Sequence, residues 1–164
     1  MRRADREVIG TENILAILNG CDVMRIGLSV DDMPYIVPMN FAVEALNGKI
    51  YIYLHCAKEG KKLDMIAKND NVCFEADTSY RTIKAENACH WGAEYRSVIG
   101  EGTVGIVHDE EQRIHALDML MERYGYDGVP RYNSRSLAAV TVLRISVTSM
   151  TGKQNMRTER NDEK

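Results

Sequence analysis

The sequence predicts a mainly β fold with some α, in the form of a six-stranded antiparallel, Greek-key-like barrel with flanking helices. Six strand-like runs can be recognised, and the few helical runs do not alternate with them as a doubly wound parallel sheet requires. Asn47-Gly48 stands between two of the runs, and this dipeptide accepts the positive φ angles of a type I′ hairpin turn. Closing an antiparallel sheet removes its exposed edges, so we expect a closed or partly closed barrel.

The composition is that of a single globular domain. The 164 residues are 45% apolar and 27% charged, which supplies enough apolar side chains for a core. We expect one domain at residues 1–151 and a polar tail at 152–164. The net charge of -3 is unlike that of a nucleic-acid binder, and no apolar run reaches the roughly 18–20 residues that cross a bilayer. No apolar segment follows MRRADREVIG as in a secretory signal, so we expect a cytoplasmic protein without nucleic-acid or membrane partners.

The strands are expected at residues 23–30, 35–46, 49–55, 71–77, 94–107 and 138–147. The first three follow one another through short turns, which predicts an antiparallel meander. In KIYIYLH, aliphatic residues alternate with Tyr51, Tyr53 and His55, which therefore share the face opposite the core.

Helices are expected at residues 11–19, at residues 61–68 and after Asp109. Thr11 is the expected N-cap of the first helix, and Asp109 that of the third. Residues 78–94 show neither a helical nor a strand period. A loop of that length is usually functional or covers something.

The segment LHCAKEGKKLDMI carries the clearest chemical signal. Gly60 precedes a predicted helix, and Lys61 and Lys62 occupy its first turn, where the helix macrodipole disfavours cations. Lysines at this position are accounted for if an anion such as a phosphate lies among ammonium and backbone N–H groups. An exposed basic turn, softened by Glu59, is the alternative.

His55 and Arg96 each have a chemical and a structural interpretation. His55 ends a strand just before the lysines, and imidazole is the side chain that exchanges protons near neutral pH; a hydrogen-bonded structural histidine is the alternative. Arg96, with Ser97 beside it, can bind a phosphate through its planar fork, or it faces solvent. Pro38 interrupts a strand, which marks an edge or a bulge.

The cysteines and the known catalytic motifs add little. Cys21, Cys56, Cys73 and Cys89 have no paired metal-ligand spacing, so we expect unpaired structural thiols and no metal site. The sequence contains no G-x-G-x-x-G, no Walker A loop, no G-x-S-x-G and no H-E-x-x-H.

Several segments together resemble one family. MRRADREV, PYIVPMNF, LHCAKEGKKLDMI, YRSVIGEG and the closing MTGK are similar, in consistent order over about residues 1–153, to the 5-nitroimidazole-resistance (Nim) proteins. These belong to the pyridoxamine 5'-phosphate oxidase-like flavin-binding split-barrel superfamily. The resemblance implies a six-stranded split β-barrel and a homodimer with two FMN sites at the subunit interface, with FAD as the alternative flavin.

The resemblance also implies the site. The lysine turn would hold the FMN phosphate, residues 38–41 would lie along the isoalloxazine, and residues 96–98 would line the ribityl or phosphate side. The implied cofactor-binding residues are Pro38, Met39, Asn40, Phe41, Ala57, Gly60, Lys61, Lys62, Arg96, Ser97 and Val98, and His55 is the implied catalytic residue beside the flavin.

We therefore expect an FMN-binding oxidoreductase that reduces nitroaromatic compounds such as 5-nitroimidazoles. His55 would supply protons or orient the substrate, and the 78–94 segment, with Tyr80 and Trp91, would cover the flavin edge. A non-enzymatic flavin or haem carrier of the same fold is one alternative, since fold does not determine reaction. The other is a structural or regulatory barrel in which the lysine turn is only a surface feature.

Overall fold

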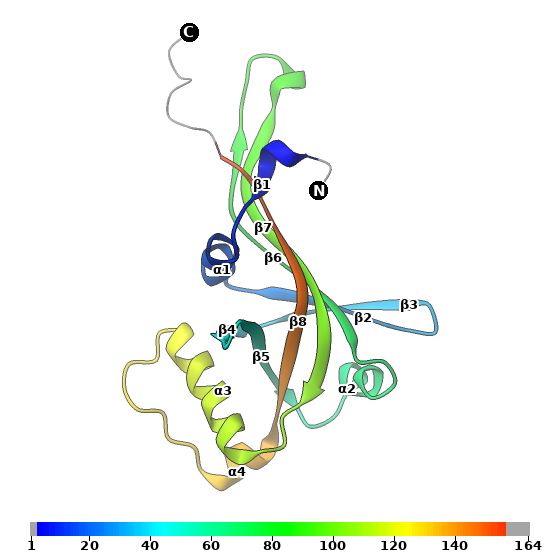
Figure 1. Cartoon of the computed structure of the whole chain (residues 1–164), viewed down its shortest axis with the longest axis vertical. Helices are drawn as coiled ribbons and strands as arrows, with labels where there is room; N and C mark the ends of the chain where they lie inside the picture. Colours follow the sequence, from blue (N-terminus) through cyan, green and yellow to red (C-terminus); the bar gives the residue numbers. More distant parts are fainter. Residues whose placement is uncertain (1–2, 157–164) are drawn as a thin grey trace.

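The structure is a computed structural model that describes residues 3–156. Figure 1 shows a long ribbon of strands along the longest axis, with α2, α3 and α4 at its lower part and α1 near the middle. The elements in chain order are η1 (Ala4–Arg6), β1 (Glu7–Val8), α1 (Thr11–Asn19), β2 (Met24–Val30), β3 (Met33–Met39), β4 (Phe41–Leu46), β5 (Lys49–Ala57), α2 (Lys61–Ile66), β6 (Asn71–Ile83), η2 (Ala88–His90), β7 (Gly92–Ile106), α3 (Glu110–Arg123), α4 (Ser134–Ala139) and β8 (Val140–Asn155).

The strands form one antiparallel sheet in the order β3-β2-β6-β7-β8-β5-β4, with β1 added beside β8. The predicted mainly β architecture with a few helices is therefore confirmed. The sheet has eight strands rather than six. Within the described residues it does not close through backbone pairing, because β3 and β4 stand at the two ends of the order.

The expected strand at 35–46 is in fact two strands, separated at Asn40. β3 pairs with β2, whereas β4 pairs with β5. The chain therefore crosses from one end of the strand order to the other between β3 and β4. The predicted meander is therefore two separate hairpins. The turn of the second hairpin is confirmed, since Asn47 and Gly48 have φ angles of 52° and 74°.

The segment at 78–94 is mainly strand, which corrects the prediction of a loop. β6 continues to Ile83 and β7 begins at Gly92, leaving a short connection that contains η2. The register shifts between Thr78 and Arg81, and Ser79 has a φ of 60°. Such a bulge bends the ribbon, and Figure 1 shows this hairpin projecting at the upper end of the molecule. We call the segment 79–92 the arm.

Both ends of the domain also differ from expectation. β8 continues through Asn155, where it pairs with Tyr95 of β7, so the strand extends into the segment expected as a tail. The rest of that tail, from residue 157, lies outside the described residues. Gly10 rather than Thr11 occupies the N-cap position of α1, with a φ of 90° that favours glycine.

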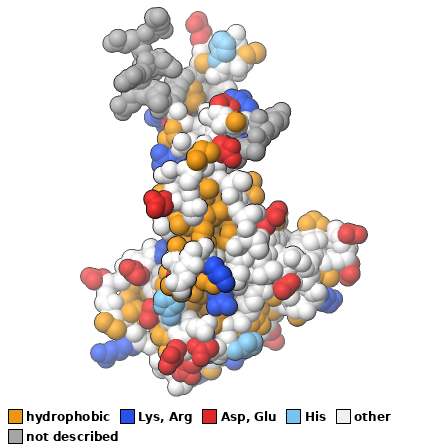
Figure 2. All heavy atoms as spheres, in the orientation of Figure 1, with side chains coloured by type: hydrophobic (Ala, Val, Ile, Leu, Met, Phe, Trp, Pro, Cys, Tyr) orange, Lys and Arg blue, Asp and Glu red, His pale blue; other side chains and the backbone are white. Residues whose placement is uncertain are grey.

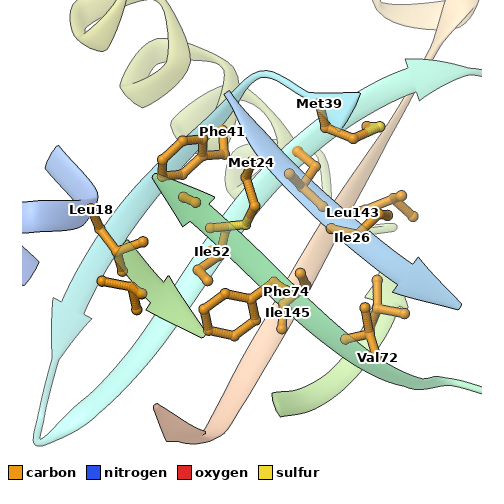
Figure 3. Packing of buried hydrophobic residues seen from close by; sticks show 14 of the residues in the cluster. Leu18, Met24, Ile26, Met39, Phe41, Ile52, Val72, Phe74, Leu143 and Ile145 are labelled. Carbon is orange, nitrogen blue, oxygen red and sulfur yellow. The ribbon is translucent and has the colours of Figure 1, made fainter. Parts of the chain in front are cut away.

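The barrel interior is the main core. Figure 3 shows how side chains from α1, β2, β4, β5, β6 and β8 meet there. Leu18, Met24 and Phe41 are fully buried, as are Ile52 and Ile145. Burial of such a side chain stabilises the fold by about 1.5–3 kcal/mol.

A second core lies on the outer face of β4 and β5, where α3 covers the sheet. Tyr53, Leu117, Leu120 and Val142 are buried in it. The tyrosine face of β5, expected to lie opposite the core, is therefore covered as well. Asp109 accepts the Gln112 N–H at 2.9 Å, so the predicted cap of α3 is confirmed.

α4 was not predicted. It occupies the start of the run expected as the last strand, which begins only at Val140. No helix among residues 3–156 is long and apolar enough to cross a bilayer.

Candidate functional site

The lysine turn joins β5 to α2. The Lys61 ammonium lies 4.4 Å from the ring centroid of Tyr35, and the Lys62 Nζ lies 3.2 Å from Met39 Sδ. Both partners come from β3. Across residues 3–156, neither ammonium forms an ion pair with a carboxylate. These contacts of the two adjacent cations are therefore with uncharged groups, an arrangement that favours an anion.

A thiol completes the surroundings of Lys62. Burial raises the pKa of Cys56, and the nearby Lys62 ammonium offsets part of this effect. The thiol is therefore a neutral neighbour and does not balance the lysine charge. The positive charge at this end of the barrel remains available for an anionic ligand.

The backbone of the turn depends on Gly60. Its φ of 133° is a conformation that other residues rarely adopt, and a Cβ there would face open space. The Gly60 carbonyl accepts the N–H groups of Leu63 and Asp64 at 2.8 and 3.3 Å, which begins α2. Ala57 is exposed at the end of β5, on the approach to the turn. The turn is thus open to solvent beside both lysines.

The 38–41 segment is divided by the fold. Met39 brings the end of β3 to the lysine turn, and Pro38 and Asn40 on either side of it are exposed. Phe41 is fully buried and donates its backbone N–H to the Tyr124 hydroxyl at 3.1 Å. Its ring and its N–H are therefore occupied by contacts within this chain, and its place along the isoalloxazine stays a prediction.

The 96–98 segment lies on a different part of the molecule. Arg96 is exposed on β7 opposite Thr78, whereas β6 begins near α2 at Asn71. The distance along β6 between those levels is roughly 20–25 Å at the usual strand rise, beyond the reach of an arginine side chain. Ser97 is half-buried and Val98 is fully buried in the barrel core. One chain alone does not bring Arg96 to the lysine turn.

His55 also lies apart from the lysine ammonium groups. It is exposed on β5 opposite Val142. Successive side chains of a strand point to opposite faces, so His55 shares the face of Tyr53, while Cys56 points toward Lys62 and the barrel interior. The predicted position of His55 on the tyrosine face is confirmed, but its proximity to the lysines in sequence does not extend to a shared face.

A polar cluster on the second core was not predicted. Glu44 accepts a hydrogen bond from the Tyr53 hydroxyl at 2.7 Å and pairs with His115 at 2.9 Å. Burial raises the pKa of Tyr53 to about 12, and Glu44 contributes to the shift. Burial alone raises the pKa of Glu44, but the bonds from Tyr53 and His115 outweigh it and lower the net value. No sequence signal links these residues, because His115 is far from Glu44 along the chain.

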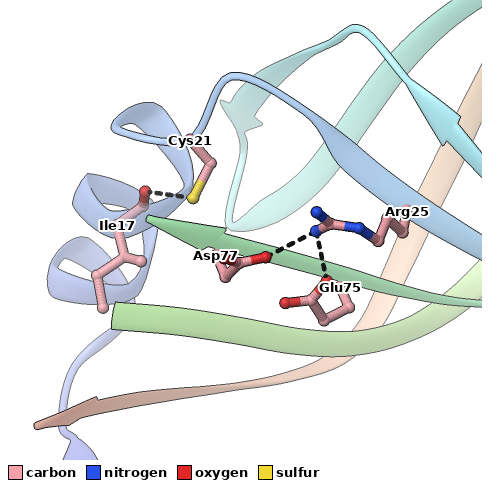
Figure 4. Close-up of polar contacts among 5 residues, drawn as sticks. All are labelled: Ile17, Cys21, Arg25, Glu75 and Asp77. Atoms are coloured by element: carbon pink, nitrogen blue, oxygen red, sulfur yellow. Dashed lines mark hydrogen bonds and ion pairs between the residues drawn. The ribbon is translucent and has the colours of Figure 1, made fainter. Parts of the chain in front are cut away.

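The cysteines are unpaired, as expected. Figure 4 shows the Cys21 thiol donating to the Ile17 carbonyl at 3.2 Å, and burial raises its pKa to about 11. The same view shows Arg25 bridging Glu75 and Asp77 at 3.0 and 2.7 Å. Within residues 3–156, no group of three His, Cys, Asp or Glu side chains is placed to hold a metal ion.

The antiparallel fold of this chain is shared with known proteins. The family model of pyridoxamine 5'-phosphate oxidase matches residues 10–154. The chain belongs to the pyridoxamine 5'-phosphate oxidase family. This finding confirms the family resemblance seen in the sequence.

Solved structures agree with this family. A protein described as a candidate 5-nitroimidazole antibiotic resistance protein of Bacteroides thetaiotaomicron is 30% identical; the match covers 90% of this chain and 86% of that one, with a TM-score of 0.78. The flavocytochrome Anf3 of Azotobacter vinelandii is 17% identical, with 99% and 75% covered and a TM-score of 0.80. A protein of Mycobacterium smegmatis named for FAD and haem binding is 18% identical, with 93% and 74% covered and a TM-score of 0.79.

The last two likenesses, at such low identity, show the fold alone. Among curated proteins, no match to this chain was found. A shared fold does not determine the reaction, which depends on the residues of the site.

Proposed function

We propose that this family member is a cytoplasmic, homodimeric FMN-binding oxidoreductase that reduces nitroaromatic compounds such as 5-nitroimidazoles. The observation that carries the proposal is the lysine turn, where Lys61 and Lys62 have no carboxylate partner among the described residues. The 30% identity to a candidate 5-nitroimidazole resistance protein supports the substrate class.

The residues of the turn fit a flavin phosphate. Lys61 and Lys62 would hold it through their ammonium groups, and Gly60 leaves the backbone open beside them. Met39, Pro38 and the exposed Asn40 would border the same ligand. FMN supplies electron-transfer chemistry when bound, and the chain binds it, orients it and limits access of water. FAD remains the alternative flavin.

The homodimer accounts for the separation of Arg96 from the lysines. A two-fold axis can place Arg96 and Ser97 of one copy against the lysine turn of another, so that each site is completed by both chains. The arm would then reach the site of the second copy, where Tyr80 and Trp91, 71% and 52% exposed, would cover the flavin edge. His55 is proposed to supply protons to the substrate or to orient it.

The first experiment is a visible absorption spectrum of the purified protein, before and after addition of FMN and desalting. We expect a retained flavin band for the wild type and none for the double variant Lys61→Ala, Lys62→Ala. Lys49→Ala is the matched control, because Lys49 is an exposed lysine at the opposite end of β5. FMN at 100 times its Kd should stabilise the wild type by about 2.7 kcal/mol. Equal flavin retention by wild type and double variant would contradict the phosphate assignment.

Turnover separates the enzyme from the alternative, a non-enzymatic flavin or haem carrier. The carrier is favoured by the resemblance of the fold to proteins named for flavin and haem, with TM-scores of 0.80 and 0.79. An oxidoreductase should oxidise NADH or NADPH in the presence of a 5-nitroimidazole, and His55→Ala should lower its turnover or change its pH dependence. A tightly bound flavin without turnover, or a Soret band, would support the carrier instead.

A further inference from the structure

A pocket lies at the lower end of the sheet, beside Lys58 at the start of the lysine turn, and neither Lys61 nor Lys62 lines it. Its volume is about 280 Å³, and it is formed where β7 ends and β8 begins. Ile106 and Val140 supply apolar lining, and Thr141 adds a hydroxyl. His55 lies on the same face of the sheet, opposite Val142, but does not line the pocket. Pockets for drug-sized ligands are about 300–1,000 Å³, so this pocket suits a smaller molecule.

The ionisable side chains that line this pocket are a lysine, an arginine and a histidine. Lys58, Arg113 and His108 line it, and none of its lining residues is acidic. The Arg113 Nη2 donates to the carbonyls of Leu137 and Val140 at 2.6 and 3.2 Å, which fixes the guanidinium at the wall. Within residues 3–156, neither Lys58 nor Arg113 forms an ion pair. Neither charge is therefore paired directly with a carboxylate of the described residues.

Acidic residues lie near this pocket but do not line it. Figure 2 shows acidic side chains gathered at the lower end of the molecule, where α3 begins in Figure 1. Asp109, the residue before α3, lines a neighbouring pocket of about 420 Å³ and accepts the Gln112 N–H. That hydrogen bond holds its carboxylate at the start of α3.

We propose that the pocket formed by Lys58, His108 and Arg113 binds a small organic anion with an apolar body and a single carboxylate or phosphate group. The anionic group would lie between the Lys58 ammonium and the Arg113 guanidinium, since these groups bind oxyanions through charge-assisted hydrogen bonds. The Thr141 hydroxyl can donate a further bond, and the apolar body would contact Ile106 and Val140.

Ligand-observed NMR titration tests this site, with benzoate as the probe and benzyl alcohol as its uncharged counterpart. We expect benzoate to bind more tightly than benzyl alcohol, and added salt to weaken it. Lys58→Glu should lower the affinity for benzoate about tenfold, equivalent to about 1.4 kcal/mol. Lys49→Glu makes the same change in net charge at an exposed position outside the pocket and should leave the affinity unchanged.

The double variant Lys61→Ala, Lys62→Ala separates this site from the proposed flavin site. It should keep wild-type affinity for benzoate, whether or not FMN binds to the wild type. Loss of benzoate binding in the double variant, with retention in Lys58→Glu, would place the anion at Lys61 and Lys62 and overturn the inference. Equal affinities for benzoate and benzyl alcohol, or equal effects of Lys58→Glu and Lys49→Glu, would also overturn it.

Discussion

At the scale of single residues, Arg123 connects more of the structure than its position in sequence indicates. Its Nη2 donates to the carbonyls of Leu18 and Cys21 at 2.8 and 2.6 Å, and its guanidinium lies 4.1 Å from the centroid of the Phe41 ring. The last carbonyls of a helix have no partner within it, so Arg123 satisfies the end of α1 from the end of α3. The sequence alone does not distinguish Arg123 from an arginine exposed on the surface.

Replacing Arg123 with alanine should reduce the free energy of unfolding by several kcal/mol, because hydrogen bonds to a charged group contribute about 1.5–3 kcal/mol each. Arg123→Lys should recover only part of the loss, since an ammonium lacks the planar fork. Urea denaturation measures both. The control is Arg135→Ala on the exposed surface of α4, and an equal loss in that variant would refute a special role for Arg123.

Gly100 and Gly105 of β7 differ in the space that a side chain would have. A Cβ on Gly100 would come within 2.2 Å of Phe74 Cζ and 2.7 Å of the Ser149 carbonyl, whereas one on Gly105 would meet nothing within 4 Å. Gly100→Ala should therefore destabilise the fold by about 1–3 kcal/mol through overpacking. Gly105→Ala should change stability by no more than about 0.5 kcal/mol. Thermal melts of the two variants check this, and a similar Tm for both would contradict it.

Tyr53 makes stability depend on pH in the alkaline range. Burial, with help from Glu44, raises its pKa to about 12 from the ordinary value near 10. The folded state therefore favours the neutral phenol, and the resulting stability is fully present below about pH 10 and is lost as pH rises toward 12. Urea denaturation between pH 8 and about 11 should show a smaller alkaline loss for Tyr53→Phe than for wild type. An identical pH profile would count against this assignment.

At the scale of elements, local signals were sufficient to predict the start of α3 and the turn of the β4–β5 hairpin. Asp109 caps α3, and Asn47-Gly48 turns the hairpin. The break at Asn40 has no such local cause. It arises because β3 and β4 join different neighbours in the sheet, a fact about pairing partners distant in sequence.

The cap of α3 can be tested directly. Asp109→Ala should lower the free energy of unfolding by about 1 kcal/mol, because the Gln112 N–H would lose its acceptor. Asp109→Asn keeps an acceptor and should be close to wild type. Chemical denaturation of the three proteins provides the comparison, and equal stability of wild type and Asp109→Ala would show that water replaces the cap without cost.

At the scale of the whole molecule, the elongated shape of the chain keeps apart the groups that would bind one flavin in the proposed function. The lysine turn lies by α2, while Arg96 lies further along the β6–β7 ribbon toward the arm (Figure 1). Figure 2 shows apolar side chains gathered across the middle of one face. On the sheet, Ile99 of β7 and Ile36 of β3 are 57% and 67% exposed. Large exposed apolar patches mark interaction sites, and a second copy is the partner that the proposed function requires.

Complementation between two variants tests this dimer. We expect Lys61→Ala, Lys62→Ala and Arg96→Ala each to lose FMN as homodimers. Mixed after unfolding and refolding together, they should recover about one quarter of the wild-type flavin content, because about half of randomly formed dimers are mixed and each has one intact site. Flavin absorbance after desalting measures the recovery. No recovery would indicate that Arg96 and the lysines do not act across a subunit interface.

The site residues stay a prediction, but part of their local structure could be anticipated from the sequence. The lysine turn beside Met39 could be anticipated, because Gly60, Lys61 and Lys62 are adjacent in the chain and their chemistry is local. The burial of Phe41 could not, because it depends on Arg123 and Tyr124 of α3. The cluster of Glu44, Tyr53 and His115 was not predicted either, because it also depends on contacts between residues distant in sequence.

The sequence by itself determined the antiparallel β class, the family, the hairpin at Asn47 and the basic turn at Lys61, since each rests on neighbouring residues or on patterns along one segment. Only the tertiary structure decided which strands pair, which face of β5 is covered by α3, and how far Arg96 lies from the lysines. These depend on contacts between distant segments, whose packing free energy is shared among many side chains and is not encoded at any single position.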